Sequence, residues 1–434
     1  MIDKLKKILI SRKDISGWKI KFIDIESEEL FFIRKSLDMN RCKNVEHLKL
    51  TIYMDCEDDG KKYRGSSTAE IHPTYTEDEI REAIDETAFA ASLIKNDYYP
   101  LAKPCENDSE ALVSNFSEKP LAQWVAPVTD AIFKADVYSK GYINSTEVFL
   151  SKIYTRILNS EGVDVNFTNY SGTVEFIVDW KEIGEEIELY KNIEFSEFDS
   201  ESITQKVDEM LKLAKHKAFA GITPKLKKST VLLTGEPVAT LFSYYYYQAN
   251  AEMAYNKLSN FNVGESVQGD SIEGDRINIT LKKNLRGSTK SMPYDSDGFP
   301  ISDVSLIEEG VLKRYWGNIR YSHYLGAKPT GNIENIVVGG GSKSIEELKE
   351  EPYLELLAFS DFQIDDLTGD FAGEIRFGWY YDGISTVPVT GGSISGNLKE
   401  VHNKLFISRE LQQDNEFVGP KTVKLSDINV AGIK

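Results

Sequence analysis

Alternation of apolar and polar side chains along the first 71 residues limits most strongly how this chain can fold. Four runs carry the pattern: GWKIKFIDI (17–25), ELFFIRKSL (29–37), HLKLTIYMD (47–55) and KYRGSSTAEI (62–71). Successive side chains of a strand point to opposite faces, so a period of two predicts strands with one buried face. Charged or turn-rich stretches separate the runs, which is typical of a meandering antiparallel sheet.

Helical patterns follow these runs. TEDEIREAIDETAFAASLI (76–94) has a threonine cap and an acidic first turn before residues at helical spacing, which predicts a helix. More strands are predicted between 146 and 195, and SITQKVDEMLKLAKHKAFA (202–220) predicts another helix. Strands followed by helices that cover one face indicate an α+β layer.

The length of 434 residues indicates two domains. GITPKLKK around Pro224 is the best boundary. We expect an N-terminal α+β domain at 1–223, with subregions of about 1–101 and 117–221 joined by a polar connection at 102–119. Residues 224–434 contain many short alternating runs broken by Gly, Asp and Asn turns. They predict a mainly antiparallel β domain, barrel- or sandwich-like, with a few helices.

A strand that becomes a helix opens this second half. In TVLLTGEPVATLFSYYYYQANAEMAY (230–255) the β-branched run 230–234 gives way to apolar residues at helical spacing. Thr234 is the expected N-cap, and Glu236 falls in the first turn, where a carboxylate suits the helix dipole. Glu236 is therefore either a catalytic base or a residue that only favours the helix start.

The same helix contains four consecutive tyrosines: Tyr244, Tyr245, Tyr246 and Tyr247. Successive helix positions step by about 100°, so the four rings cannot share one face. Burial against strands of the same domain is the favoured interpretation, and a binding or subunit interface rich in aromatic residues is the alternative.

Several kinds of chemistry lack a signature in the sequence. The nearest two of the five histidines are 25 residues apart, and the three cysteines all lie within the first 105 residues without metal-ligand spacing. No GxSxG elbow is present. Acidic residues outnumber basic ones 69 to 51, which disfavours nucleic-acid binding. The odd cysteine count and the lack of a signal-peptide pattern or a long apolar run predict a cytoplasmic protein without a membrane span.

Clustered aspartates offer one further possibility. YDSDGFP and DFQIDDLTGDF could in principle bind a hard cation, but neither completes a calcium loop, and turn chemistry explains DSDG. A hydrolase that uses Asp295, Asp297 or Asp370 is the least favoured hypothesis, because the spacing identifies no acid and base pair.

Six ordered segments make the chain resemble the TldD/TldE (PmbA) proteins, long labelled modulators of DNA gyrase. The segments are SMPYDSDGFP (291–300), IEEGVLKRYW (307–316), SHYLGAKPTGN (322–332), LTGDFAGEIRFGWYYDG (367–383), GGSISGNL (391–398) and FVGPKTVKLSDINVAG (417–432). The N-terminal half agrees in its order of elements, so the resemblance covers nearly the whole chain.

The resemblance implies a specific interpretation of the strand-to-helix stretch. The TldD kind of subunit is similar to a zinc metallopeptidase and carries HExxxH on this helix, with a cysteine near the C-terminus as a further ligand. In this chain GEPVAT places Gly235 and Thr240 at the histidine positions, Glu236 coincides with the motif glutamate, and no cysteine follows Cys105. The chain therefore looks like the TldE/PmbA kind, without catalytic or metal-binding residues of its own.

From this resemblance we expect a non-catalytic subunit of a zinc metallopeptidase complex that processes small or unfolded peptides. Its expected partner is a TldD-like subunit in a heterodimer, with the zinc in that partner and no cofactor in this chain. The alternative is a stand-alone homodimeric protein that binds peptides or acts as a scaffold without peptidase activity.

Overall fold

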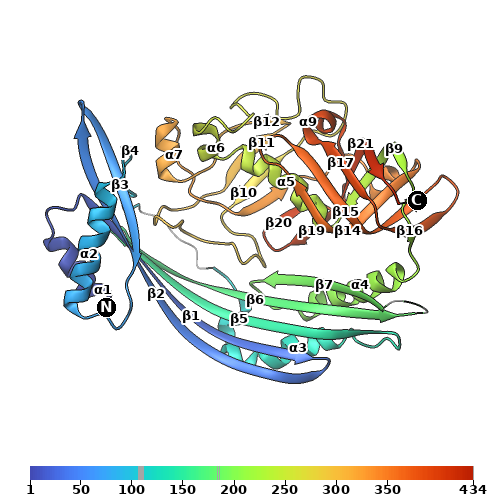
Figure 1. The fold of residues 1–434 in the computed structure, drawn as a ribbon, viewed down its shortest axis with the longest axis horizontal. Helices are drawn as coiled ribbons and strands as arrows, with labels where there is room; N and C mark the ends of the chain where they lie inside the picture. Colours follow the sequence, from blue (N-terminus) through green and yellow to red (C-terminus); the bar gives the residue numbers. More distant parts are fainter. Residues whose placement is uncertain (106–111, 183, 185, 434) are drawn as a thin grey trace.

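The computed structural model describes residues 1–105, 112–182, 184 and 186–433. The chain has a mixed α+β fold, as the sequence predicts, with a long antiparallel sheet in its N-terminal half and a barrel with a second sheet in its C-terminal half (Figure 1). Part of the predicted connection at 102–119, residues 106–111, lies outside the described residues. Within the described ranges, no helix is both long and apolar enough to cross a membrane.

The N-terminal sheet contains seven strands in the order β4-β3-β2-β1-β5-β6-β7, and every neighbouring pair is antiparallel. The central strand β1 pairs with β2 on one side and with β5 on the other, so the sheet combines two meanders. Its strands are β1 (Gly17–Ile33), β2 (Ser36–Asp58), β3 (Lys61–Glu70), β4 (Asn96–Asp97), β5 (Gly141–Asn159), β6 (Asp164–Lys181) and β7 (Glu186–Phe195).

Strand β1 is longer than the sequence pattern predicts. The runs at 17–25 and 29–37 are not two strands, because β1 continues through the polar residues between them and turns only at Arg34, where φ is 57°. Strands β2 and β5 pair with β1 on its two sides, so the backbone N–H and C=O groups along this stretch form hydrogen bonds. Glu26 also forms an ion pair with Lys152 of β5 at 2.9 Å. The polar interruption is therefore held within the strand by its neighbours.

Two pairs of helices cover different ends of this sheet (Figure 1). Trp18 and Ile20 of β1 pack in a core with α1 and α2, whereas Leu30 packs in a second core with α3 and α4. The threonine cap predicted for this helix is present at Thr76, and Glu79 completes a capping box with it. The helices are α1 (Ile2–Ser11), α2 (Glu77–Ser92), α3 (Val125–Phe133) and α4 (Ser200–Lys217), and two 3₁₀ turns lie before α3 at Asn115–Glu118 and Leu121–Gln123.

The C-terminal half contains a closed barrel, which confirms the barrel alternative of the prediction. The ring runs β14-β9-β21-β17-β15 and closes where β15 pairs with β14; only the β14–β9 pair is parallel. Its strands are β9 (Leu226–Thr234), β14 (Tyr353–Ile364), β15 (Asp370–Tyr381), β17 (Ser393–Asn397) and β21 (Thr422–Ala431), and three short strands attach to it: β8 (Gly221–Ile222), β16 (Thr386–Thr390) and β18 (Phe406–Ile407).

A second sheet of six strands lies beside the barrel in the order β12-β11-β10-β13-β20-β19. Helix α5 (Glu236–Gln248) contacts β9 and β14 of the barrel and β20 of this sheet, and one hydrophobic core joins all three. The sheet contains β10 (Ile279–Lys282), β11 (Val304–Glu308), β12 (Val311–Leu312), β13 (Asn335–Val338), β19 (Leu411–Asp414) and β20 (Phe417–Pro420); the remaining helices are α6 (Ala251–Tyr255), α7 (Ile319–Tyr324), α8 (Ile345–Leu348) and α9 (Leu398–Val401), followed by a 3₁₀ turn at His402–Lys404.

The DSDG loop at 295–298 attaches the C-terminal half to the N-terminal sheet. Asp295 accepts hydrogen bonds from the backbone N–H groups of Asp297 and Phe299, at 2.8 and 3.0 Å, which is the turn chemistry expected from the sequence. Asp297 then forms an ion pair with Lys19 of β1 at 2.5 Å. At Gly298, where φ is +74°, a Cβ would lie 2.7 Å from a methyl group of Val163, so glycine permits the close approach.

Candidate functional site

The site predicted from the sequence lies where β9 passes into α5. Thr234 ends the strand, and Gly235 links it to the helix with φ 82° and ψ −133°, a conformation that side chains disfavour. The prediction that Thr234 caps the helix is wrong, because Gly235 is the N-cap and gives no side-chain hydrogen bond. The Thr234 hydroxyl still belongs to the strand and contacts Glu355 and Thr422, each at 3.0 Å.

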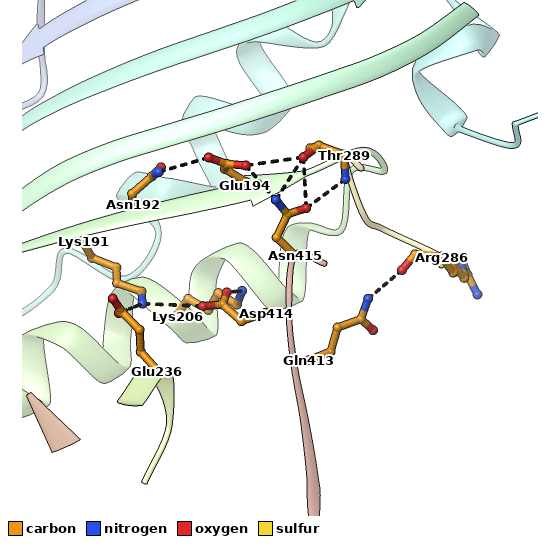
Figure 2. Close-up of polar contacts among 10 residues, drawn as sticks. All are labelled: Lys191, Asn192, Glu194, Lys206, Glu236, Arg286, Thr289, Gln413, Asp414 and Asn415. Atoms are coloured by element: carbon orange, nitrogen blue, oxygen red, sulfur yellow. Dashed lines mark hydrogen bonds and ion pairs between the residues drawn. The ribbon is translucent and has the colours of Figure 1, made fainter. Parts of the chain in front are cut away.

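Glu236 begins the helix with its side chain 69% exposed. Its carboxylate accepts a hydrogen bond from the Lys191 ammonium of β7 at 2.9 Å (Figure 2). Burial alone would lower the pKa of Lys191, but the carboxylates of Glu236 and Asp414 outweigh burial, and the pKa is raised. The cation on Lys191 is therefore stable, and it neutralises the carboxylate at the helix start.

Further polar contacts around this ion pair connect the two halves of the chain (Figure 2). Asp414 lies 3.1 Å from the Lys206 ammonium of α4 and 3.9 Å from that of Lys191. Beside it, the Asn415 amide donates to Glu194 of β7 at 2.6 Å and accepts from the Thr289 backbone at 2.8 Å. These contacts hold the β19–β20 turn against β7 and α4. The first residue of α5, Glu236, takes part in them through Lys191.

Two cavities meet along α5. One, of about 730 Å³, is lined by Glu236 and Thr240 together with residues of β7, β14 and β20. The other, of about 620 Å³, lies along the following turns of α5 beside Trp316. Both linings contain Ala239, Thr240, Glu416 and Phe417. The two cavities therefore adjoin, and we refer to them together as the groove along α5; Thr240 lines both.

Two relatives of known sequence cover most of the chain. This chain is 27% identical over 290 residues to an uncharacterised protein of Methanocaldococcus jannaschii, and the match spans 63% of this chain and 66% of the relative. It is 25% identical over 308 residues to a metalloprotease PmbA homologue of Buchnera aphidicola, spanning 64% and 66%. These matches cover slightly less than two thirds of the relatives' length.

Solved structures agree over the whole chain. TldE from Thermococcus kodakarensis superposes with a TM-score of 0.79 at 16% identity, covering 99% of this chain and all of that one. A Thermotoga maritima protein, named as a candidate modulator of a DNA gyrase, gives 0.79 at 17% identity with full coverage of both chains. These likenesses establish the fold. Residues 226–432 match the model of the PmbA/TldA metallopeptidase C-terminal domain.

The chain belongs to the TldD/TldE (PmbA) family. The resemblance to this metallopeptidase-related family, stated from six sequence segments, is thereby confirmed. The segment GEPVAT, which the resemblance aligns with HExxxH, lies inside the matched domain and at the start of α5.

The residues at the TldD/TldE motif positions do not fit a zinc ion. Gly235 has no side chain, Thr240 has a neutral hydroxyl, and the single carboxylate of Glu236 is engaged by Lys191. A tetrahedral zinc site in proteins needs several nitrogen, sulfur or carboxylate ligands. Across the part of the chain that the structure describes, no group of three His, Cys, Asp or Glu residues is placed to hold a metal.

The tyrosine run lies mainly in the core. Tyr244 and Tyr245 are fully buried, and Tyr246 stacks on Trp316 with ring centroids 4.2 Å apart while its hydroxyl donates to the Ile333 carbonyl at 2.9 Å. Tyr247 is 45% exposed and lines the 620 Å³ cavity. Tyr244, Tyr245 and Tyr246 are thus buried within the same half of the chain, and Tyr246 lines the same cavity as Tyr247. A binding or interface role of the four tyrosines stays a prediction.

The three aspartates of the hydrolase hypothesis, Asp295, Asp297 and Asp370, lie outside the two cavities along α5, whereas Asp361 of DFQIDDLTGDF lines the 730 Å³ cavity. Asp295 and Asp297 belong to the DSDG loop, and Asp370 begins β15, where it accepts a hydrogen bond from Asn397 at 2.7 Å. Sequence reasoning missed Lys191, the partner of Glu236. It stands in the strand run EIELYKNIEF as an ordinary polar residue, so no local signal distinguished it.

Proposed function

We propose that this chain is the non-catalytic subunit of a zinc peptidase complex of the TldD/TldE kind, acting in the cytoplasm. The observation that carries the proposal is the start of α5, where Gly235 stands with φ 82° at a position that requires a metal ligand in HExxxH. A backbone in this conformation disfavours any residue with a side chain. The local fold itself therefore opposes a histidine at this position.

The environment of Glu236 supports the same proposal. A general base must accept a proton from a bound water, and in a metallopeptidase the metal activates that water. Here the carboxylate pairs with the Lys191 ammonium, whose proton is held firmly by the raised pKa. Glu236 consequently joins α5 to β7 and takes no part in peptide hydrolysis.

The groove along α5 suits an extended peptide. The pairing of β14 with β9 covers only Leu354, Glu355 and Leu356, because β9 then gives way to α5. The next residues of β14, 357–362, line the 730 Å³ cavity. An unpaired strand edge can hydrogen-bond an extended chain irrespective of its sequence, which suits small or unfolded peptides as the ligands.

The zinc and the general base would come from a TldD-like partner that carries HExxxH. To test this, the chain is co-expressed with such a homologue from the same genome, and the purified material is analysed for stoichiometry, zinc and cleavage of unfolded peptides. We expect an equimolar complex with chelator-sensitive activity. Gln in place of the partner's motif Glu should abolish cleavage and leave the complex intact.

Two outcomes would contradict the proposal. Zinc binding and chelator-sensitive cleavage by the isolated chain would show that it is itself a peptidase. Purification as a homodimer that binds unfolded peptides but ignores the HExxxH homologue would establish the alternative of a stand-alone binding protein.

A further inference from the structure

A third, smaller cavity lies between the N-terminal sheet and the segment that leads into α7. Its volume is about 240 Å³. Most of its lining is polar, with hydroxyl groups from β2, β3 and the segment after β4, amides from two asparagines, and three charged side chains. These polar residues are Lys19, Thr51, Tyr53, Ser66, Thr68, Tyr99, Asn159, Asp297, Asn318 and Arg320.

Arg320 has no counter-ion among the described residues. Its guanidinium donates to the Asn96 side-chain oxygen at 2.7 Å and lies 5.5 and 5.1 Å from the ring centres of Tyr99 and Tyr321. Its Nε is buried without a hydrogen-bond partner. The side chain is partly buried, and a partly desolvated cation with no carboxylate beside it attracts an anion more strongly than a cation in bulk water does. The guanidinium is therefore suited to an anion that enters the cavity.

The other charges of this cavity cancel each other. The Lys19 ammonium, 17% exposed, pairs with Asp297 at 2.5 Å, which leaves the cavity lining with one net positive charge from Arg320. Burial raises the pKa of Tyr53 to about 12, so its hydroxyl remains a donor at neutral pH. The whole chain has a net charge of −18, so its overall electrostatic field does not attract anions. An anion in this cavity would therefore be bound by the local contacts of the lining.

The cavity adjoins the groove along α5, because Asn318 lines both it and the 620 Å³ cavity. The 620 Å³ cavity contains three glutamates, Glu252, Glu334 and Glu416, and no lysine or arginine in its lining. A carboxylate is repelled there and attracted to Arg320. A peptide that lies along the groove thus meets opposite charges in two neighbouring cavities.

We propose that the 240 Å³ cavity binds the C-terminal carboxylate of a peptide that lies in the groove, with Arg320 as its principal partner. This inference rests on the proposed peptide-binding function. The size of the cavity favours the end of a chain over a chain that passes through. A planar guanidinium can bind both oxygens of a carboxylate, and this geometry fixes the direction of the bound peptide.

The test uses the isolated full-length chain and fluorescent unstructured peptides of one sequence, either with a free C-terminal carboxylate or with a C-terminal amide. Affinities are measured by fluorescence anisotropy. We expect the free acid to bind on the order of tenfold more tightly, as a charge-assisted hydrogen bond provides. Arg320→Gln should remove this difference, Arg320→Lys should retain part of it, and Arg314→Gln, at an exposed position, should preserve it.

Equal affinities of the two peptides for the wild-type chain would overturn the carboxylate anchor while leaving peptide binding intact. The acid and amide comparison needs no variant, so it decides the matter even if Arg320→Gln fails to fold. An amide peptide with an internal aspartate that binds as tightly as the free acid would overturn the C-terminal assignment. Failure of both peptides to bind would also overturn the anchor, and the co-expression experiment tests the proposed function separately.

Discussion

The conformation of Gly235 leads to a direct prediction about stability. The residue adopts φ 82° and ψ −133°, and a Cβ built on it meets no atom within 4 Å. Gly235→Ala therefore introduces no steric clash, and its whole cost is the strain of an L-residue in a backbone region that is nearly restricted to glycine. Such strain amounts to about 1–3 kcal/mol.

Gly221→Ala is the matched control. Gly221 lies in the short strand β8, its φ is outside the left-handed region, and an added Cβ would approach only the Pro388 carbonyl, at 4.0 Å. Both substitutions reduce the freedom of the unfolded chain by a similar amount. The difference between the two variants therefore isolates the strain at Gly235, and it should be about 1–3 kcal/mol.

Urea unfolding of the two variants and the wild type measures this difference, provided that the slope of the transition is unchanged. Gly235→Ala should lower the midpoint, whereas Gly221→Ala should leave it unchanged or raise it slightly. Equal midpoints for the two variants would refute the reasoning, because Gly235 would then accept a side chain and the backbone would not oppose a histidine at the start of α5.

Three further predictions concern other parts of the chain. Gly235→His combined with Thr240→His should not create zinc-dependent peptidase activity, because the strain remains and no cysteine follows residue 105; zinc analysis and peptide cleavage check this. Tyr245→Phe should leave the melting temperature unchanged or raise it, since the buried hydroxyl has no partner, whereas Tyr246→Phe should cost about 1 kcal/mol by losing its bond to a carbonyl. Burial, with the nearby Asp297 charge, raises the pKa of Asp295 to about 7, so the folded state favours the protonated form. The stability that Asp295 contributes should therefore decline as pH rises from about 4 through 7 and then level off, and the melting temperature of Asp295→Asn should rise relative to that of wild type between pH 5 and 8; a constant difference would contradict this.

Sequence reasoning predicted the elements that depend on neighbouring residues. The threonine cap of α2 and the Asx turn at Asp295 were predicted because the interacting groups lie within four residues of each other. The N-cap of α5 was predicted one residue early, because the Thr234 hydroxyl forms hydrogen bonds with Glu355 and Thr422 of the neighbouring barrel strands and not with the start of the helix. A cap and a strand residue look alike in sequence, and only the tertiary partners distinguish them.

The candidate site was predicted in part. GEPVAT identified the residues at the motif positions, but Lys191 and Arg320 carry no local pattern. Lys191 lies 45 residues before Glu236, and the Lys19–Asp297 ion pair beside Arg320 joins residues 278 positions apart. Such pairs arise from the docking of the two halves of the chain, which the sequence pattern does not specify.

By itself, the sequence determined the antiparallel strands, the strand-to-helix transition and the absence of histidines at the motif positions, because side-chain period and residue identity are local properties. Only the tertiary structure decided that two runs form one strand, that the β14–β15 pair closes the barrel and that Gly235 adopts positive φ. Strand register and barrel closure depend on contacts between segments that are far apart in the sequence. These contacts stabilise the fold only after the segments have come together.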